Sequence, residues 1–544
     1  MTDPTPESEK SPAQLAAQAA AAVPQGTEPG MVWLVGAGPG DPGLITVSGL
    51  RALQQADVVV FDALANPALL AQAADHAERI DVGKRAKFHK LTQDQTNQLL
   101  VDLATTGKAV VRLKGGDPYL FGRGAEEAAY CARHGVPCEI VPGVTAGLAA
   151  PAAAGIPVTH RKIASTVSIV TGHEDPTKGE TSVDYTGLAS LINVGGTACF
   201  YMGVGRLQQI CDELTSRSVK HTMPVALVQW GTLPNQRYVT GTLADIKARV
   251  DEAGLGSPAI IVVGKVVAID EPGLDYFTGR PLFGQSILVT RTRPQASDLR
   301  QQLEDLGAQV YEAPTIQIVP PADWSHVDQV IDQLPDYDAI VFTSANAVEA
   351  LADRLFMSGR DSRALAGVHL SCIGQSTAEA LATALAVQAD FVPQRSIAES
   401  FADELLASSE IAGKRILLPQ ADIARPILGE KLRAAGCRVD ELVVYENQAV
   451  DALPEDVLAA LREGGVNWLT FTSSSTVRNL VDLLGDEADL LKPCRVASIG
   501  PKTTATIHDC GLSLTVEAER HDVTGLVEAL VDAMLDPVSA GQPD

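Results

Sequence analysis

Residues 112–127 read RLKGGDPYLFGRGAEE and are the most informative stretch of the chain. The apolar run at 109–111 leads into it, which predicts a buried strand ending at a Gly-Gly-Asp-Pro turn at 115–118. Two residues without a Cβ let a ligand touch the backbone there, and Asp117 places a carboxylate beside it. The stretch therefore predicts a ligand site on a strand-to-helix turn, although such a turn can also be rich in glycine for steric reasons alone.

The residues before this stretch begin the same unit. A short apolar run leads into Gly-Ala-Gly-Pro-Gly-Asp-Pro-Gly at 36–43. A dinucleotide-binding fold needs G-x-G-x-x-G that continues directly into a helix, and Pro39 and Pro42 interrupt that continuation, so a nicotinamide-dependent oxidoreductase is disfavoured. Short apolar runs alternate with helical patterns to about residue 268, with a break near 142, which predicts an α/β unit of two lobes with a parallel or mixed sheet.

The C-terminal half carries a second α/β series with an internal repeat. Phe-Thr-Ser occurs at 342–344 and 471–473, and Ile-Gly follows each copy at nearly equal spacing. The repeat predicts two similar lobes whose hydroxyl-bearing turns either cap helices or face a shared cleft. The predicted boundaries are 1–30 for a disordered leader, 31–270 for the first unit, 271–284 for a linker, 285–535 for the second unit with an inserted lobe at about 320–445, and 536–544 for a tail.

Composition and charge restrict the classes of partner. The chain has 544 residues, 46% hydrophobic and 20% charged, with a formal net charge of −25. This charge argues against nucleic acid and anionic membranes as partners, and no uninterrupted apolar run reaches the ~18 residues of a membrane span. The eight cysteines include no C-x-x-C pair. That pattern favours a reducing, cytoplasmic setting without structural zinc, another metal or a disulfide framework.

Three groups of basic residues nevertheless adjoin Gly/Pro turns after apolar strands. Exposed charges are screened beyond about 8 Å at physiological salt, so a local cluster decides what binds within that distance. A single cluster is usually a solvated loop, whereas three of them fit a small polyanionic ligand better. The clusters are Lys84, Arg85, Lys87, His89 and Lys90; Arg112, Lys114 and Arg123; and His160, Arg161 and Lys162.

Residues 31–269 resemble the uroporphyrinogen-III C-methyltransferases of the tetrapyrrole methylase superfamily. The resemblance implies a two-lobed tetrapyrrole-methylase fold, S-adenosylmethionine as the cofactor, and uroporphyrinogen III, a polycarboxylate macrocycle, as the substrate. The motifs that carry it, in the family's order, are LVGAGPGDP at 34–42, VGKR at 82–85, the stretch at 112–127, VPGVTA at 141–146, GIPVTHR at 155–161, VTGH at 170–173 and FYMG at 200–203.

The same resemblance implies roles for individual residues. Asp62 would accept a proton and Lys84 would donate one, while Arg123 and Glu126 would help to activate the substrate. From the residues alone, Asp62 at a strand end could equally be a cap. Family members commonly carry Arg-Leu-Val after this Asp, where this chain has Ala-Leu-Ala at 63–65, so one substrate contact differs. The implied cofactor residues are Pro39, Gly115, Gly116, Asp117, Leu120, Thr145, Ala146, Met202 and Gly231, and the implied substrate residues are Arg85, His89, His160 and Arg161.

Residues 285–535 resemble uroporphyrinogen-III synthase, which implies a second two-lobed α/β fold. The resemblance is carried by VTR at 289–291, FTSAN at 342–346, ADIARP at 421–426, VYE at 444–446 and IGPKT at 499–503. It implies a cofactor-free dehydration in which hydroxymethylbilane loses its hydroxyl, the last ring is inverted and the macrocycle closes.

Tyr445 would then protonate or orient the departing hydroxyl. Without the resemblance it would be an edge-of-core residue with a solvated hydroxyl. The residues implied to hold substrate carboxylates are Arg291, Ser344, Arg425, Ser474 and Thr503.

Together these observations predict a bifunctional enzyme that makes uroporphyrinogen III and methylates it twice to precorrin-2, for sirohaem or cobalamin. The family suggests a homodimer through the methyltransferase half. An alternative keeps the methyltransferase and makes the second half a tetrapyrrole-binding regulatory module without synthase activity. Gln420, where relatives often have Arg, favours this alternative.

Overall fold

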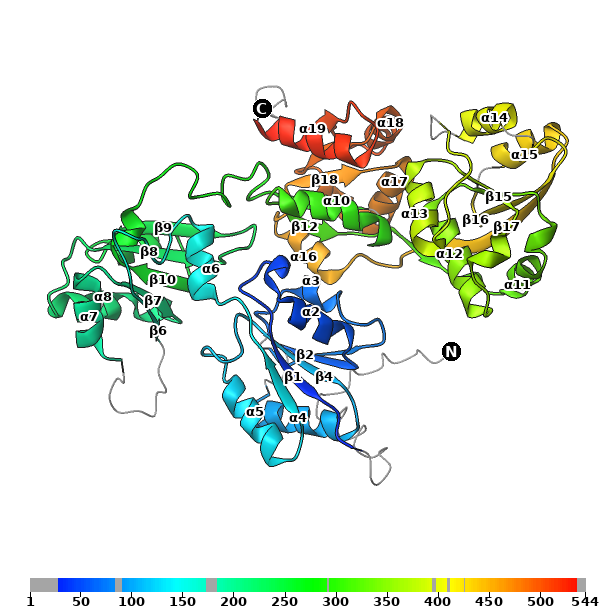
Figure 1. The fold of residues 1–544 in the computed structure, drawn as a ribbon. Helices are drawn as coiled ribbons and strands as arrows, with labels where there is room; N and C mark the ends of the chain where they lie inside the picture. Colours follow the sequence, from blue (N-terminus) through cyan, green and yellow to red (C-terminus); the bar gives the residue numbers. More distant parts are fainter. Residues whose placement is uncertain are drawn as a thin grey trace, which may run out of the picture. The chain divides into compact units, whose positions relative to one another are not determined.

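The computed structural model describes residues 28–83, 91–172, 183–290, 293–393, 398–408, 411–424 and 426–535. The chain divides into two compact units: one is residues 1–285 with 303–309, and the other is residues 286–302 with 310–544. Both units are built from sheets flanked by helices (Figure 1), which confirms the predicted α/β class.

The first lobe of the first unit is a parallel sheet in the order β3-β2-β4-β1-β5. Successive residues of a strand face opposite sides, so Val58 packs with Leu100 of one helix layer and Val59 packs with Leu53 of the other. The strands are β1 (Val32–Gly36), β2 (Val58–Phe61), β3 (Glu78–Asp81), β4 (Val110–Lys114) and β5 (Cys138–Val141), and the helices are α2 (Val47–Gln54), α3 (Pro67–Leu70), α4 (Gln93–Thr105) and α5 (Gly124–Arg133).

Strand β4 is the centre of this sheet and is buried at all five positions. Two of those positions are cations, Arg112 and Lys114, which are only 6% and 4% exposed. Because they are two residues apart, both side chains lie on the same face of the sheet. Charged groups are rarely buried without partners, so this face must supply counter-charges.

The second lobe of the first unit is a mixed sheet in the order β6-β7-β10-β8-β9, in which only the β6–β7 pair is parallel. Its core lies between the sheet and the helices that flank it. The strands are β6 (Val167–Thr171), β7 (Thr197–Tyr201), β8 (Pro224–Gln229), β9 (Arg237–Thr242) and β10 (Ala259–Val263), and the helices are α6 (Ala146–Ala153), α7 (Tyr185–Asn193), α8 (Leu207–Ser216) and α9 (Ile246–Glu252).

The second unit also contains two five-stranded sheets, ordered β12-β11-β18-β19-β20 and β13-β17-β16-β14-β15. The second sheet takes all of its strands from residues 316–449, whereas the first takes strands from before and after that segment. The strands are β11 (Ser286–Val289), β12 (Gln309–Glu312), β13 (Ile316–Val319), β14 (Ala339–Phe342), β15 (His369–Cys372), β16 (Arg415–Ala421), β17 (Arg438–Ala449), β18 (Trp468–Phe471), β19 (Arg495–Ser498) and β20 (Val516–Glu517).

Helices flank both of these sheets (Figure 1). They are α10 (Arg293–Asp305), α11 (Ser325–Asp332), α12 (Ala345–Met357), α13 (Gln375–Leu385), α14 (Ala398–Ser408), α15 (Ile427–Ala434), α16 (Glu455–Arg462), α17 (Ser474–Leu484), α18 (Pro501–Asp509) and α19 (Val523–Leu535). In the part of the chain that the structure describes, no helix is long and apolar enough to cross a membrane.

The repeated Phe-Thr-Ser segments form the same strand-to-helix turn in both lobes. Ser344 precedes α12 and Ser473 precedes α17, with nearly identical φ values of −160° and −161°. Each hydroxyl accepts the N–H three residues later, that of Ala347 or Thr476. The serines therefore cap helices, which is one of the two uses that the sequence allowed.

Candidate active site

Glycine-rich loops at the ends of β1, β4 and β5 pack backbone against backbone. The N–H of Gly116 donates to the carbonyl of Gly38 at 2.7 Å, and the N–H of Gly38 donates back at 3.3 Å. A Cβ on Gly143 would overlap the Gly116 carbonyl, so only glycine permits this approach. Gly116 itself has a φ of +69° and open space where a Cβ would stand. The turn thus offers accessible backbone.

Asp117 fixes these loops relative to one another. Its Oδ1 accepts the N–H of Tyr119 at 2.8 Å, and its Oδ2 accepts the N–H of Gly143 at 3.1 Å. The carboxylate therefore ties the loop after β4 to the loop after β5. A carboxylate has about four acceptor sites, so these two bonds leave room for a ligand donor.

Tyr201, at the end of β7, connects the same region to the second lobe. Its hydroxyl is hydrogen-bonded to the Thr145 hydroxyl and accepts the N–H of Gly147 in the first turn of α6. The Phe121 ring lies edge-on to the Tyr201 ring, with 5.3 Å between centroids. Burial raises the pKa of Tyr201, so the phenol stays neutral and keeps both hydrogen bonds.

Two more contacts join the loop after β8 to α6 and to the loop after β1. Gly231 lies so near α6 that a Cβ there would overlap Ala150. The N–H of Asp41 donates to Thr232 Oγ1 at 3.1 Å, so the loop after β8 also contacts the loop after β1. We call this set of loops the loop ring, and it consists of residues 37–41, 115–121, 142–147, 201–203 and 230–236.

All the residues predicted to hold the cofactor lie on the loop ring. Met202 is 50% exposed and has a φ of +53°, a backbone conformation that is uncommon outside glycine. Large apolar side chains on or beside these loops are exposed, although such residues are usually buried. They are Leu64, Tyr119, Phe121, Leu148 and Met202.

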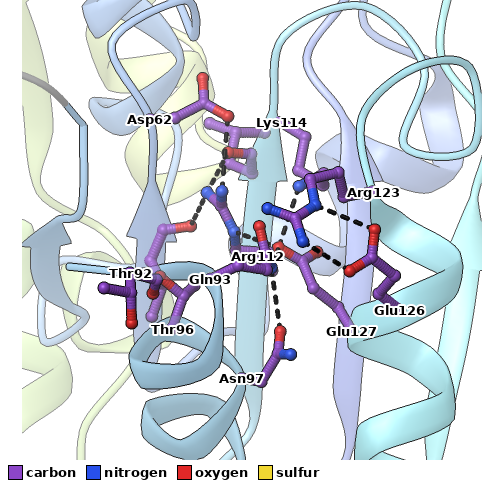
Figure 2. Close-up of polar contacts among 12 residues, drawn as sticks. Asp62, Thr92, Gln93, Thr96, Asn97, Arg112, Lys114, Arg123, Glu126 and Glu127 are labelled. Carbon is purple, nitrogen blue, oxygen red and sulfur yellow. Dashed lines mark hydrogen bonds and ion pairs between the residues drawn. The ribbon is translucent and has the colours of Figure 1, made fainter. Parts of the chain in front are cut away.

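A buried ionic network lies under the first lobe's loops (Figure 2). Glu127 Oε1 accepts from Lys114 Nζ at 3.0 Å and from Arg112 Nε at 3.4 Å. Arg112 also reaches Asp62, with 3.5 Å between Nη2 and Oδ2. Gln93 of α4 donates to Glu127 Oε1 at 3.1 Å. Burial lowers the pKa of Lys114, and the nearby Arg112 charge lowers it further.

This network corrects one expectation from the sequence. Arg112 and Lys114 were predicted to belong to a surface cluster that binds a polyanion, but both are buried with an internal counter-ion. Arg123 is the exposed member of that cluster, and it forms a two-bond pair with Glu126 at 2.9 and 2.7 Å. That pair raises the pKa of Arg123 and lowers the pKa of Glu126.

Asp62 stands at the exposed edge of the network. Its side chain is 27% exposed, and its Oδ1 accepts the N–H of Leu64 at 3.1 Å. The capping use that the sequence allowed is therefore present, and the only partner of Oδ2 among the described residues is Arg112, at 3.5 Å. His160 and Arg161 lie on a partly exposed loop before β6.

In the second unit, two of the predicted residues meet. The Tyr445 hydroxyl lies 3.2 Å from Ser344 Oγ, and Tyr445 is only 7% exposed. The hydroxyl is therefore not solvated in the way that an edge tyrosine would be. Gln420, on the neighbouring strand β16, contacts Glu441 at 3.5 Å through its amide nitrogen.

The other two described residues of this set lie at adjacent turns of the other sheet. Ser474 Oγ donates to the carbonyl of Lys502 at 3.0 Å, and Thr503 follows directly and is 4% exposed. The structure therefore brings Tyr445 to Ser344, and Ser474 to the turn that contains Thr503.

Comparison with known proteins agrees with the division of the chain into two α/β units. Residues 31–247 match the family model "Tetrapyrrole (Corrin/Porphyrin) Methylases", and residues 297–528 match "Uroporphyrinogen-III synthase HemD". The chain is 35% identical to the porphyrin biosynthesis protein HemD of Ruminiclostridium josui over 93% of this chain and 98% of that protein. This chain belongs to the fused uroporphyrinogen-III C-methyltransferase and synthase family.

Other relatives match the methyltransferase part of the fusion. An S-adenosyl-L-methionine-dependent uroporphyrinogen III methyltransferase of Methanosarcina barkeri is 47% identical over 44% of this chain and 94% of its own length. A siroheme synthase of Pseudomonas fluorescens is 48% identical, but the chain covers only 53% of that protein. Among solved structures, a uroporphyrin-III C-methyl transferase of Thermus thermophilus in complex with S-adenosylhomocysteine covers 44% of this chain and all of its own, with 37% identity and a TM-score of 0.37.

Five of the predicted catalytic and substrate-binding residues lie outside the described residues: Lys84, Arg85, His89, Arg291 and Arg425.

Two residues of the methyltransferase unit were missed by sequence reasoning. Glu127 follows Glu126 directly, and nothing in the sequence alone separates the buried carboxylate from the exposed one. Arg112 and Lys114 could have indicated such a carboxylate, because two cations on one face of an apolar strand require a nearby counter-ion. Tyr201 was quoted within a family motif, but its link to α6 depends on tertiary contact.

Proposed function

We propose that the chain is a bifunctional enzyme of tetrapyrrole biosynthesis. The second unit cyclises hydroxymethylbilane to uroporphyrinogen III with inversion of the last ring, and the first unit methylates that product twice to precorrin-2. S-adenosylmethionine is the methyl donor. The observation that carries the proposal is the loop ring, which brings residues of the methyltransferase motifs together beside Asp62, at the edge of the buried ionic network.

The chemistry of the loop ring suits S-adenosylmethionine. Open space at Gly116 lets an adenosine or amino-acid group approach the main chain, and the exposed apolar side chains suit the uncharged adenine ring of the ligand. When bound, the cofactor supplies an electrophilic methyl group. Because its leaving group departs neutral, the chain's main task is alignment, which the interlocked loops provide.

A proton must also leave the macrocycle, and Asp62 is placed to accept it. Its carboxylate is partly exposed beside the loop ring, since Leu64, two residues later, lies against Gly115. One oxygen is used by the backbone, while the other, among the residues that the structure describes, makes a single 3.5 Å contact with Arg112. A carboxylate held this loosely can accept a proton from a carbon acid at hydrogen-bond distance.

For the synthase unit, the proposal rests on Tyr445 and Ser344. A phenol in a buried setting that shares a hydrogen bond with a serine hydroxyl is oriented to donate to a departing hydroxyl group. The step breaks the carbon–oxygen bond of hydroxymethylbilane, and the oxygen leaves as water. Helix N-termini at the Ser344 and Ser473 turns provide backbone N–H groups that suit substrate carboxylates.

The test is a coupled assay on the purified chain. Hydroxymethylbilane and methyl-labelled S-adenosylmethionine are supplied together, and the expected product is dimethylated precorrin-2. If label enters product from added uroporphyrinogen III but not from hydroxymethylbilane, the synthase part of the proposal is wrong. If neither substrate is methylated, the methyltransferase part is wrong.

The alternative is a second unit that binds tetrapyrrole and regulates the first without catalysis. It is favoured by Gln420, which contacts Glu441 instead of offering a cation. Binding of uroporphyrinogen III by the second unit without any cyclisation by the unmodified chain would support it. A cytoplasmic location, a homodimer and the choice between sirohaem and cobalamin as end product stay predictions.

A further inference from the structure

We propose that Glu127 is a positioning residue that keeps Asp62 available as a proton acceptor by holding Arg112 away from it. The inference deepens the proposed methyltransferase function and rests on it. It concerns a residue that touches neither the loop ring nor solvent: Glu127 is 0% exposed and lies in the first turn of α5.

Arg112 is shared between two carboxylates. Its Nε lies 3.4 Å from Glu127 and its Nη2 lies 3.5 Å from Asp62, and both distances exceed the 2.7–2.9 Å of a close charge-assisted bond. Its Nη1 is anchored by the carbonyls of Leu113 at 3.1 Å and Val60 at 3.4 Å. The guanidinium thus stands between the two acids and pairs closely with neither.

The charges explain why both acids are needed. Two buried cations, Arg112 and Lys114, face one fully buried carboxylate and one partly exposed carboxylate. If the buried negative charge of Glu127 were removed, Asp62 would be the remaining carboxylate of this network within reach of Arg112. The Arg112 guanidinium would then form two parallel hydrogen bonds with the partly exposed carboxylate of Asp62. Asp62 would be neutralised by that pair and would accept protons poorly.

The hydrogen bonding of Glu127 is also incomplete. Lys114, Arg112 and Gln93 all approach Oε1, while Oε2 is buried without any hydrogen-bond partner among the described residues. Buried polar atoms in native proteins are almost always satisfied, so an unsatisfied carboxylate oxygen is costly for stability. If Glu127 served only to stabilise the fold, a hydrogen bond to Oε2 would stabilise it further. The missing bond therefore favours a functional role for the negative charge of Glu127.

The test uses Glu127→Gln, which keeps the shape and removes the charge. In single-turnover assays with uroporphyrinogen III, methyl transfer is expected to fall roughly 100-fold, at the lower end of the contribution of a positioned proton acceptor. Binding of S-adenosylhomocysteine is expected to be unchanged, because Glu127 is not on the loop ring. Glu213→Gln is the control: it removes the carboxylate of Glu213 on α8, which pairs with Arg217 just after the helix, and activity is expected to stay unchanged.

A double-mutant comparison separates positioning from simple structural support. In an Asp62→Asn background, Glu127→Gln is expected to cause no further loss, because its effect passes through Asp62. Equal losses in both backgrounds would overturn the proposal, and so would full activity of Glu127→Gln. If the unmodified chain does not methylate uroporphyrinogen III, the proposed function fails instead.

A second variant covers the case in which Glu127→Gln does not fold. Lys114→Met combined with Glu127→Gln removes one charge of each sign, and replacing a buried pair by uncharged groups is often neutral for stability. Arg112 is still freed to close on Asp62, so methyl transfer is expected to fall by the same factor. A folded double variant with unchanged activity would overturn the proposal.

Discussion

At the scale of single residues, the site depends on which glycines and charges the fold brings together. The glycines at 115–116 predicted that a ligand could touch the backbone, which stays a prediction, and the structure shows in addition that Gly38 and Gly116 pack backbone against backbone. The roles of the charges were harder to predict, because Arg-Leu-Lys reads the same whether the cations are exposed or buried. The counter-ion comes from a helix that packs on that face of the sheet, and only the three-dimensional fold shows this.

Gly143 is the residue whose replacement tests the close approach of these loops. Gly143→Ala places a methyl group against the Gly116 carbonyl, and overpacking of this kind costs about 1–3 kcal/mol of unfolding free energy. Binding of S-adenosylhomocysteine is expected to weaken as the two loops separate. Gly135→Ala is the control for general destabilisation, because the φ of +72° at Gly135 strains any side chain there, while the residue has open space around it and lies away from the loop ring. Equal binding by the two variants would contradict the account.

At the scale of elements, strands and helices followed the apolar patterns, while the link at α6 did not. Thr145 occupies the N-cap of this helix, a position at which threonine usually bonds the helix backbone. Its hydroxyl instead bonds Tyr201, and the Tyr201 hydroxyl accepts the N–H of Gly147. A capping contact supplied by a distant strand leaves no local signal, which is why the sequence did not predict it.

Tyr201→Phe tests this link through stability and its dependence on pH. Losing the acceptor for Gly147 is expected to cost about 1–3 kcal/mol of unfolding free energy near neutral pH. Because burial raises the pKa of Tyr201 above its ordinary value of 10.0, its stabilising contribution is complete below pH 10 and is lost as pH rises through the folded-state value. Chemical unfolding from pH 8 upward should therefore show the difference between the two proteins shrinking. A constant difference would contradict the assignment.

At the scale of the whole molecule, two α/β units each carry their own candidate site, so the two proposed activities should be separable by mutation. The alternation of strands and helices and the repeated Phe-Thr-Ser turns predicted the class and the similar lobes. The pairing of Tyr445 with Ser344 could not be predicted from the residues alone, because it joins a strand to a helix start about a hundred positions earlier.

Tyr445→Phe tests this separation. Cyclisation of hydroxymethylbilane is expected to fall by at least roughly 100-fold, as for loss of a general acid, while methylation of added uroporphyrinogen III stays unchanged. Tyr337→Phe is the control, since Tyr337 is a buried tyrosine of the same lobe whose hydroxyl bonds Asp440 at 2.8 Å. Unchanged cyclisation by Tyr445→Phe would show that the phenol has no part in the chemistry.

The most direct test of the central claim, that the loop ring is a methyl-donor site, is titration calorimetry of the intact chain with S-adenosylhomocysteine. The account predicts saturable binding at one site per chain, weakened by Gly143→Ala and unaffected by Tyr445→Phe. Absence of binding by folded protein that still binds uroporphyrinogen III, or binding that Gly143→Ala leaves unchanged, would contradict it.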